Sequence, residues 1–210
     1  MRRVGEFSRG GAAPPPRAFL GAPASRRLLK RDEFSPFLRL AGQEIVRWVG
    51  AEVAVSGGEP VDEGEPTVYS PVCWYHESVP YLQLTWLDIQ LADGRELRLL
   101  AQLDDGREYY GFYLVPAAAF WVDEPLPRPP WSIYRTRELT GLPTGTAHVS
   151  ILRADGPHAV IEFSLSIGSD SLSFLAAEVY EQFDGTLRIV EADENILLQL
   201  NGAMPQLADG

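Results

Sequence analysis

The chain has 210 residues, 45% of them hydrophobic, and a formal net charge of −11. This length allows one sizeable hydrophobic core, and a sequence without a run of about 18 apolar residues offers no membrane-spanning helix. Cys73 is the only cysteine, which excludes an intrachain disulfide and a structural zinc site built from cysteines. We therefore expect a soluble cytoplasmic protein that needs no cofactor.

The charge is distributed unevenly along the chain. Residues 1–31 contain eight Arg or Lys residues and the single acid Glu6, a charge of +7, so the rest of the chain carries −18. A body this acidic repels nucleic acids and anionic membranes and favours cationic partners. Residues 1–33 are rich in Gly, Pro, Ala and Arg without any period, which predicts a disordered basic tail. An organelle transit peptide and a nucleic-acid-binding arm are the alternatives. Residues 34–205 then form one β-rich domain.

Two kinds of signal overlap between residues 34 and 55. Ser35-Pro36 is a good helix start, whereas Gly42 and a run of β-branched residues from Ile45 favour a strand. We expect the strand to begin at about Glu44. An acidic loop follows at residues 57–66. The next segment, 68–80, brings several reactive or aromatic side chains together: Cys73, Trp74, Tyr75, His76 and Glu77.

The most regular pattern surrounds Asp93-Gly94 and predicts a β-meander. Apolar residues alternate with polar ones on both sides of this dipeptide. A two-residue loop there would set apolar residues opposite charged ones. A three-residue loop, Ala92-Asp93-Gly94, with Gly94 in the left-handed conformation, instead places Ile89 opposite Leu97.

The second half of the chain is again predicted to be β. Residues 116–130 form a proline-rich connector, since prolines cannot donate to a central sheet ladder. A two-residue turn at Gly168-Ser169 would set Leu165 opposite Leu172 and Phe163 opposite Phe174. After a further turn at Asp184-Gly185, we expect residues 187–189 to pair with residues 196–198 across an acidic turn at 191–194.

The two halves resemble one another. Residues 87–101 and 161–177 both read as strand, glycine turn and strand, followed by a small residue. This internal similarity predicts two similar meander modules, at about 37–115 and 132–201, joined by the connector. The predicted fold class is therefore mainly β with little helix: an antiparallel β-sandwich or partly open barrel in which the modules share one core.

No known catalytic pattern stands out. Cys73 and His76 are a candidate nucleophile and base, but residues three apart on a strand face opposite sides, and a lone cysteine is more often a small buried hydrophobe. The other histidines, His148 and His158, do not have zinc-site spacing. Whether the chain is an enzyme is left open, and a non-enzymatic role is preferred.

Two acidic clusters contain enough oxygen atoms for weak calcium binding. They are Asp62, Glu63 and Glu65 in the first acidic loop and Glu191, Asp193 and Glu194 towards the end of the sequence. Neither has the calcium-loop spacing D-x-D-x-D-G with a distant Glu, so we interpret both as solvated hairpin tips. We predict neither a metal site nor a catalytic residue.

Aromatic residues are concentrated in the middle third of the chain. Tyr109, Tyr110 and Tyr113 fall on both faces of one predicted strand, so some of them should reach the surface, where aromatic rings favour partner interfaces. Together with the acidic body, this pattern favours a non-catalytic module that binds a basic protein partner, as an immunity or inhibitor protein does. The predicted binding residues are Asp62, Glu63, Glu65, Asp104, Asp105, Glu108, Tyr109, Tyr110 and Tyr113.

Two other functions stay open at this point. One is a β-sandwich or barrel that holds a small ligand among its aromatic residues, and the other is an enzyme with an unrecognised active site. We expect neither nucleic acid nor membrane as a partner, and the sequence does not predict an oligomeric state.

Overall fold

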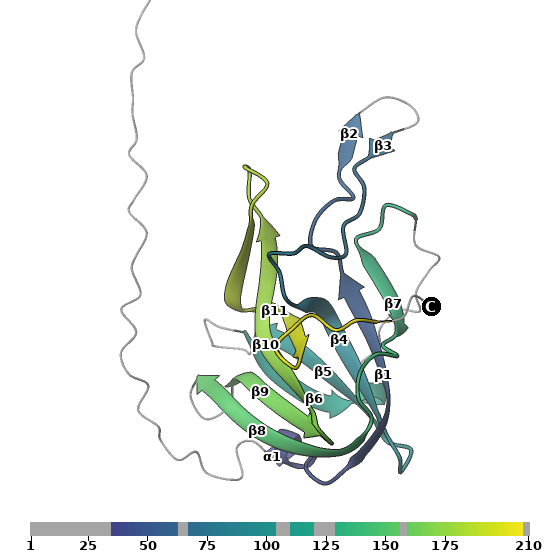
Figure 1. Ribbon diagram of the computed structural model, residues 1–210, viewed down its shortest axis with the longest axis vertical. Helices are drawn as coiled ribbons and strands as arrows, with labels where there is room; N and C mark the ends of the chain where they lie inside the picture. Colours follow the sequence, from purple (N-terminus) through teal and green to yellow (C-terminus); the bar gives the residue numbers. More distant parts are fainter. Residues whose placement is uncertain (1–34, 63–66, 104–109, 120–128, 156–158, 208–210) are drawn as a thin grey trace, which may run out of the picture.

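The computed structural model describes residues 35–62, 67–103, 110–119, 129–155 and 159–207 (Figure 1). Helix is confined to α1 (Ser35–Leu38) and the 3-10 turn η1 (Ala117–Ala119) within these ranges, and neither is long enough to cross a membrane. The predicted basic tail and residues 120–128 of the connector lie outside the described residues.

The remaining elements are strands. In chain order they are β1 (Glu44–Val53), β2 (Pro60–Asp62), β3 (Val68–Tyr69), β4 (Leu82–Leu91), β5 (Glu96–Leu103), β6 (Tyr110–Pro116), β7 (Tyr134–Glu138), β8 (Gly145–Asp155), β9 (Ala159–Ile167), β10 (Asp170–Glu181) and β11 (Leu187–Leu200). The predicted start of a strand at about Glu44 is confirmed by β1, and the helix-start signal at Ser35 coincides with the short helix α1.

Nine of the strands form one antiparallel sheet that curls into a partly closed ring. Their order is β10-β11-β4-β5-β6-β9-β8-β1-β7, with additional pairings between β9 and β10 and between β1 and β4. Because β9 pairs with both β6 and β10, the strands from β10 round to β9 close on themselves. The predicted class, a mainly β sandwich or partly open barrel, is confirmed.

The strand pairings of the two halves follow the same plan. β4, β5 and β6 form one meander, and β9, β10 and β11 form another. β1 pairs with β4 as β8 pairs with β9. The last strand of each meander also pairs with the first strand of the other, β6 with β9 at Phe112 and Val160, and β11 with β4 from Ile196 to Leu198. The similarity between the halves is therefore one of connectivity as well as of sequence.

Both predicted hairpin registers are confirmed. Gly94 has a φ of +85°, and Ile89 lies opposite Leu97. This φ strains any residue with a Cβ, so a glycine ends the three-residue loop. In the second half, Leu165 lies opposite Leu172 and Phe163 opposite Phe174.

The predicted pairing of residues 187–189 with 196–198 is wrong. Both segments belong to one long strand, β11, and both pair with β10: Ile189 lies opposite Val179, and Leu198 lies opposite Phe174. β10 is 12 residues long, so its ladder has room for both segments. The acidic segment 191–194 is therefore part of an irregularity within a strand, and the hairpin turn is the one at Asp184-Gly185, where the amide of Gln182 donates to the carbonyl of Thr186.

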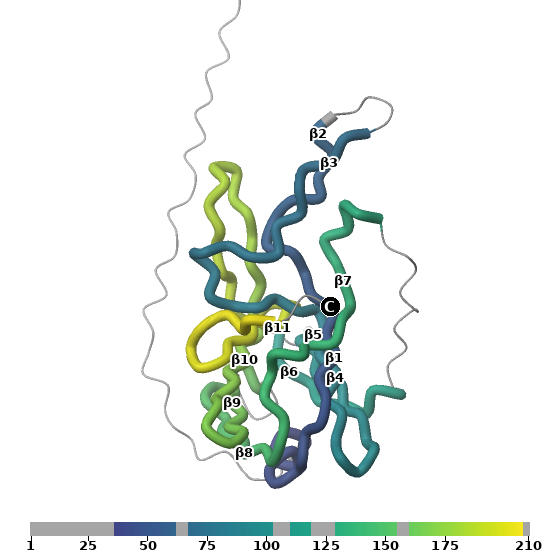
Figure 2. The backbone as a smooth tube through the Cα atoms, turned by 45° about the vertical axis from the view of Figure 1, so that its right-hand side comes forward, coloured from purple at the N-terminus to yellow at the C-terminus, as the bar shows by residue number. Residues whose placement is uncertain are grey.

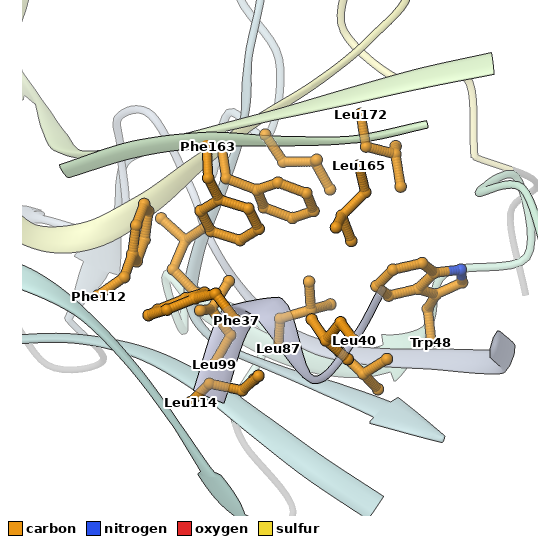
Figure 3. Close-up of a cluster of buried hydrophobic side chains, with 14 of the residues drawn as sticks. Phe37, Leu40, Trp48, Leu87, Leu99, Phe112, Leu114, Phe163, Leu165 and Leu172 are labelled. Carbon is orange, nitrogen blue, oxygen red and sulfur yellow. The ribbon is translucent and has the colours of Figure 1, made fainter. Parts of the chain in front are cut away.

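One large core fills the interior between the strands (Figure 3). Phe163 stacks on Phe174 with ring centroids 4.5 Å apart and meets the edge of Phe112 at 5.3 Å. The indole of Trp48 lies at one side of this core, and its Nε1 donates to the carbonyl of Pro143 at 2.8 Å. Since both meanders contribute rings, neither module has a hydrophobic core of its own.

A second, smaller apolar cluster packs against β10 and β11. It consists of Val55, Val79, Ala177, Val179 and Leu197. The buried side chain of Gln83 also links β4 to β10, because its Oε1 accepts a hydrogen bond from the amide of Val179 at 2.8 Å. These contacts attach the loop before β4 to the part of the β10–β11 hairpin that extends beyond the ring.

Candidate functional site

Two hairpins project from the same end of the barrel. One is β2–β3, and the other is the outer half of β10–β11 with its turn at Asp184-Gly185, as Figure 2 shows. Tyr134, at the start of β7, belongs to the same end, because it lies opposite Val53, the last residue of β1. We call this region the arm end.

An irregularity in β11 brings acidic side chains to the arm end. Ala176 lies opposite Ile196, yet the next residue, Ala177, lies opposite Glu191. Four residues of β11, Ala192–Asn195, are therefore inserted into the ladder, and Ala192 adopts a φ of +57°, which is uncommon for a residue other than glycine. We call this insertion the β11 bulge. It turns Asp193, Glu194 and Asn195 out of the regular alternation of the strand.

The β11 bulge forms part of the wall of a hollow of about 570 Å³. Strands from both modules contribute to the wall, which consists of Thr85, Leu100, Ala101, Gln102, Tyr110, Tyr134, Glu178, Glu194 and Asn195. Seven of these nine residues carry polar side chains, and two of them are carboxylates. Among the described lining residues there is no Arg, Lys or His, so the charged side chains in the described part of the wall are both acidic.

Asn195 is the most buried polar side chain of this wall. It is 4% exposed, and its amide makes no hydrogen bond with any other residue in the described part of the chain. A buried polar group without a partner costs on the order of 1–3 kcal/mol. The amide is therefore a donor and acceptor that a bound group could satisfy.

A hydrogen-bonded triad stands next to the hollow. The hydroxyl of Tyr180 lies 3.0 Å from Oε2 of Glu178 and 3.1 Å from Oδ2 of Asp193. A phenol has one proton, so it can donate to only one of the two carboxylates at a time. The negative charge of this cluster is thus only partly compensated by hydrogen bonding.

Burial and then the neighbouring groups shift the pKa values of Glu178 and Tyr180 in the triad. Burial raises the pKa of Glu178, the hydrogen bond from Tyr180 opposes this shift, and the charges of Asp193 and Glu194 raise the pKa further. The pKa of Tyr180 is also raised, first by burial and then by its hydrogen bond to Glu178. A cation bound in the hollow would relieve the repulsion among these groups.

Arg153, an arginine of the second module, pairs with acids of β9 and β11. Nη1 of Arg153 lies 2.7 Å from Glu191, and its Nε lies 3.6 Å from Glu162. Arg153 therefore compensates the acid that precedes the β11 bulge, and it does not line the hollow.

A buried ion cluster fixes the strand that carries Tyr134. Glu52 on β1 is 1% exposed and accepts hydrogen bonds from Arg135 and from Arg137, the latter at 2.7–2.8 Å. The guanidinium of Arg135 also lies 4.1 Å from the ring centre of Trp74. Because a buried carboxylate is destabilising without its partners, this cluster ties β7 and the 68–80 segment to β1.

A second buried ion pair also combines a carboxylate, an arginine and a tryptophan ring. Asp88 and Arg98, on adjacent positions of β4 and β5, form a two-point ion pair with distances of 2.6 and 2.7 Å. The guanidinium lies 4.5 Å from the ring centre of Trp86. The hydrogen bond that Arg98 donates to Asp88 raises the pKa of Arg98, against the effect of burial. This pair joins two strands of the first meander.

Exposed aromatic side chains surround the arm end. Phe183 is fully exposed at the turn of the β10–β11 hairpin, and Tyr75 is also exposed. Trp131 stacks on Tyr69 of β3, with ring centroids 4.4 Å apart. Large exposed rings near a polar hollow are typical of interaction surfaces.

The predicted binding residues are only partly described by the structure. Asp62 ends β2, but its side chain, together with Glu63, Glu65, Asp104, Asp105, Glu108 and Tyr109, lies outside the described residues. Tyr110 is half-buried and lines the hollow. Tyr113 is half-buried too; it lies opposite the lining residue Leu100 on β5 but is not itself among the lining residues.

Sequence reasoning missed Glu178 and Asn195, and it misplaced Glu194 on a hairpin tip. The signal that could have found them is the segment E-A-D-E-N at 191–195, which breaks the alternation of an otherwise apolar strand. Nothing in the sequence indicates that this segment faces Gln102 and Tyr110, because that proximity depends on how the two modules pair.

The side-chain hydrogen bonds described for Cys73 and His76 are local, and the side chain of Cys73 also packs against the second apolar cluster. The thiol of Cys73 donates to the carbonyl of Tyr75 at 2.9 Å, and Nδ1 of His76 lies 2.7 Å from the hydroxyl of Ser78. His158 lies outside the described residues. Over the described ranges, no three His, Cys, Asp or Glu side chains are grouped so that they could hold a metal ion.

Comparisons with protein-family models, with curated proteins and with solved structures each gave no significant match. Function therefore has to be inferred from the chemistry of the site.

Proposed function

We propose that this protein is a non-catalytic acidic binding module for a cationic protein partner, in the manner of an immunity or inhibitor protein, and that the arm end is its contact surface. The observation that supports this most is the hollow: two carboxylates and the unsatisfied amide of Asn195 line it, and no described basic residue does. Such a wall is complementary to a positively charged group.

The overall charge supports the same proposal. Outside the first 31 residues the chain carries −18, far more than solubility requires in a domain of this size. A field of one sign accelerates the encounter with an oppositely charged partner, with a rate that falls as salt is added. The acids therefore serve the association step.

The exposed rings favour a macromolecular partner over a small ligand. Phe183, Tyr75 and Trp131 lie outside the lining of the hollow, so a small molecule in the hollow would leave them uncovered. Aromatic anchors at an interface chiefly slow dissociation.

A small organic ligand is the second candidate, and the size of the hollow favours it. A volume of about 570 Å³ is within the range of ligand pockets. The site would be the same hollow at the arm end, because the space between the strands is occupied by the core rings of Phe112, Phe163 and Phe174.

The proposal is tested by affinity capture from a lysate of the native host, with the full chain as bait. The wild type is compared with the hollow variant, Glu178→Gln/Glu194→Gln, and with a control, Glu44→Gln/Glu96→Gln. The control removes the same charge from two exposed residues, the first residues of β1 and β5, which are not among the lining residues of the hollow. We expect the wild type and the control to retain the same basic protein and the hollow variant to lose it. Equal retention by both variants, or the absence of a basic protein, would contradict the proposal.

A further inference from the structure

We infer that Asn201 is a site of spontaneous covalent modification. Its side chain deamidates through a cyclic imide formed with the backbone nitrogen of Gly202, and hydrogen bonds from Asn201 to β10 slow this reaction in the folded protein. The site follows the end of β11 and is not part of the lining of the hollow, so the inference is independent of the proposed function.

Asn201 and Gly202 form a tight turn after β11. Their φ angles are +54° and +77°, and the amide of each flanking residue, Leu200 and Ala203, donates to the carbonyl of the other at 2.8 and 3.1 Å. A two-residue turn of this kind favours Asn-Gly, because both central residues adopt the left-handed conformation. The turn therefore selects a dipeptide that is also chemically reactive.

The reactivity comes from the absence of a side chain at Gly202, since a Cβ would crowd its backbone nitrogen. This nitrogen attacks the side-chain carbonyl carbon, Cγ, of Asn201 and loses its proton. The bond between Cγ and Nδ2 breaks, and ammonia leaves. Water then opens the succinimide ring at either carbonyl, which yields aspartate or isoaspartate. The reaction needs water but neither an oxidant nor a reductant.

Three hydrogen bonds hold Asn201 against the start of β10. Its Oδ1 accepts from the amide of Ser171 at 2.9 Å, and its Nδ2 donates to Oδ1 of Asp170 at 2.8 Å. The backbone amide of Asn201 also donates to the carbonyl of Ser171 at 2.8 Å. We call these three bonds the β10 clasp. Both ends of the side-chain amide that would react are therefore already bound.

The bond to Asp170 opposes the reaction in two ways. It restrains the side chain, so Cγ approaches the nitrogen of Gly202 only when the clasp opens locally, and the population of such an open state limits the rate. Donation to a carboxylate also leaves Nδ2 richer in electrons, which makes it a poorer leaving group. Loss of one hydrogen bond to a charged group raises an open population about tenfold.

The other asparagine of the chain provides an internal comparison. Asn195 is 4% exposed and precedes Ile196, whose β-branched side chain crowds its own backbone nitrogen. Ile196 is also held in the sheet opposite Leu84. We therefore expect Asn195 to keep its amide while the protein is folded.

Deamidation would weaken the contacts that restrain Asn201. The product has no Nδ2 donor and places a second carboxylate beside Asp170, and isoaspartate adds a methylene group to the backbone of the turn. The segment after the turn contributes Met204 and Leu207, which pack against the main core. The modification therefore loosens the attachment of this segment to the core.

The experiment is incubation of the full chain at mildly alkaline pH, with deamidation located by peptide mass spectrometry. The samples are the native wild type, the wild type unfolded in urea, and the variants Asp170→Ala and Asp170→Asn. A matched control, Asp93→Ala, removes an exposed carboxylate from the turn of the first meander. Circular dichroism reports whether each variant is folded.

We expect Asn201 to be modified slowest in the native wild type and fastest in urea. Asp170→Ala should accelerate the reaction in the folded protein about tenfold, because one charge-assisted hydrogen bond is lost. Asp170→Asn, which keeps an acceptor oxygen without its charge, should lie between the two, and Asp93→Ala should react as the wild type does.

Three outcomes overturn the inference. Equal rates at Asn201 in the native and urea-unfolded wild type would show that the fold does not control the reaction, and this comparison needs no variant. A wild-type rate in folded Asp170→Ala would show that the clasp does not protect Asn201. Faster modification of Asn195 than of Asn201 in the native protein would show that the site is wrong.

Discussion

The strand pairs β5–β6 and β10–β11 occupy equivalent places in the two meanders, and both line the hollow, but only the second supplies its carboxylates. β5 and β6 pair without interruption from Leu97 and Pro116 to Leu103 and Tyr110. β10 and β11 continue further and include the β11 bulge. The comparison teaches that residues inserted into a ladder can bring acidic side chains to a surface, because regular alternation would have directed the acids of β11 elsewhere.

The largest expected effect is a difference in stability between two substitutions on the β10–β11 hairpin, one inside the ring and one at the exposed turn. Phe174 is fully buried and stacks on Phe163, so Phe174→Ala should lower the free energy of unfolding by about 3–5 kcal/mol. Phe183→Ala, on the same hairpin but fully exposed, should change it by no more than about 0.5 kcal/mol. Urea denaturation of both variants measures the difference, and similar losses would contradict the division between ring and arm.

The second prediction concerns deletion of the β11 bulge, which would make the β10–β11 ladder as regular as the β5–β6 ladder. Deleting residues 192–195 would join Glu191 to Ile196, whose partners Ala177 and Ala176 are already adjacent. The ladder would then be continuous, as it is in β5–β6. We expect a folded protein that no longer retains the captured partner. Circular dichroism and the affinity capture check it, and unchanged retention would show that the β11 bulge is not part of the site.

The third prediction concerns the turn of the regular module. Gly94 has a φ of +85° and open space around the position of a Cβ, so the cost of a substitution there is conformational and not steric. Gly94→Val should destabilise the protein by about 1 kcal/mol or more. Gly94→Asn, which tolerates the left-handed conformation better, should cost less. Thermal melts of the two variants give the comparison, and equal melting temperatures would contradict it.

The smallest expected effect is a change in the pH dependence of stability caused by Glu178. The pKa of Glu178 is raised in the folded state, mainly by burial, so the native protein binds more protons than the unfolded chain just above the usual pKa of glutamate. Stability contributed by the protonated group is present at lower pH and is lost as the pH rises through the folded pKa. Glu178→Gln should remove this part of the pH dependence and stabilise the protein at pH 7 by a few tenths of a kcal/mol, since solvent screens a half-buried group. A steeper loss of stability with rising pH in the variant would contradict this assignment.

Prediction from the sequence succeeded where the determinants are local. The alternation around Asp93-Gly94 and the glycine at position 168 each specify a register, because a shift by one residue would expose every apolar side chain of the strand. The same reasoning failed for β11. Residues 187–189 and 196–198 are both apolar and alternate well, so each could pair with the other as readily as with β10, and only the length of β10 decides between them.

The candidate site could not be predicted in the same way. Glu178, Glu194 and Tyr110 come from three strands, and they meet because β11 pairs with β4 and because the β11 bulge is inserted where it is. Neither pairing nor insertion leaves a periodic trace in the sequence. The acidic run E-A-D-E-N is visible in the sequence, but its position within a strand is not, and its composition alone indicates a solvated tip.

The last strand of each module pairs with the first strand of the other module's meander, and this affects how the chain folds. The ring closes through contacts of Leu82 and Leu84 with Leu198 and Ile196, residues more than a hundred positions apart in the sequence. Pairings this distant are slow to form, because a long loop must be closed before they stabilise anything. During synthesis, the apolar face of the first module therefore stays uncovered until β11 has been made. The two modules then reach their stable form together.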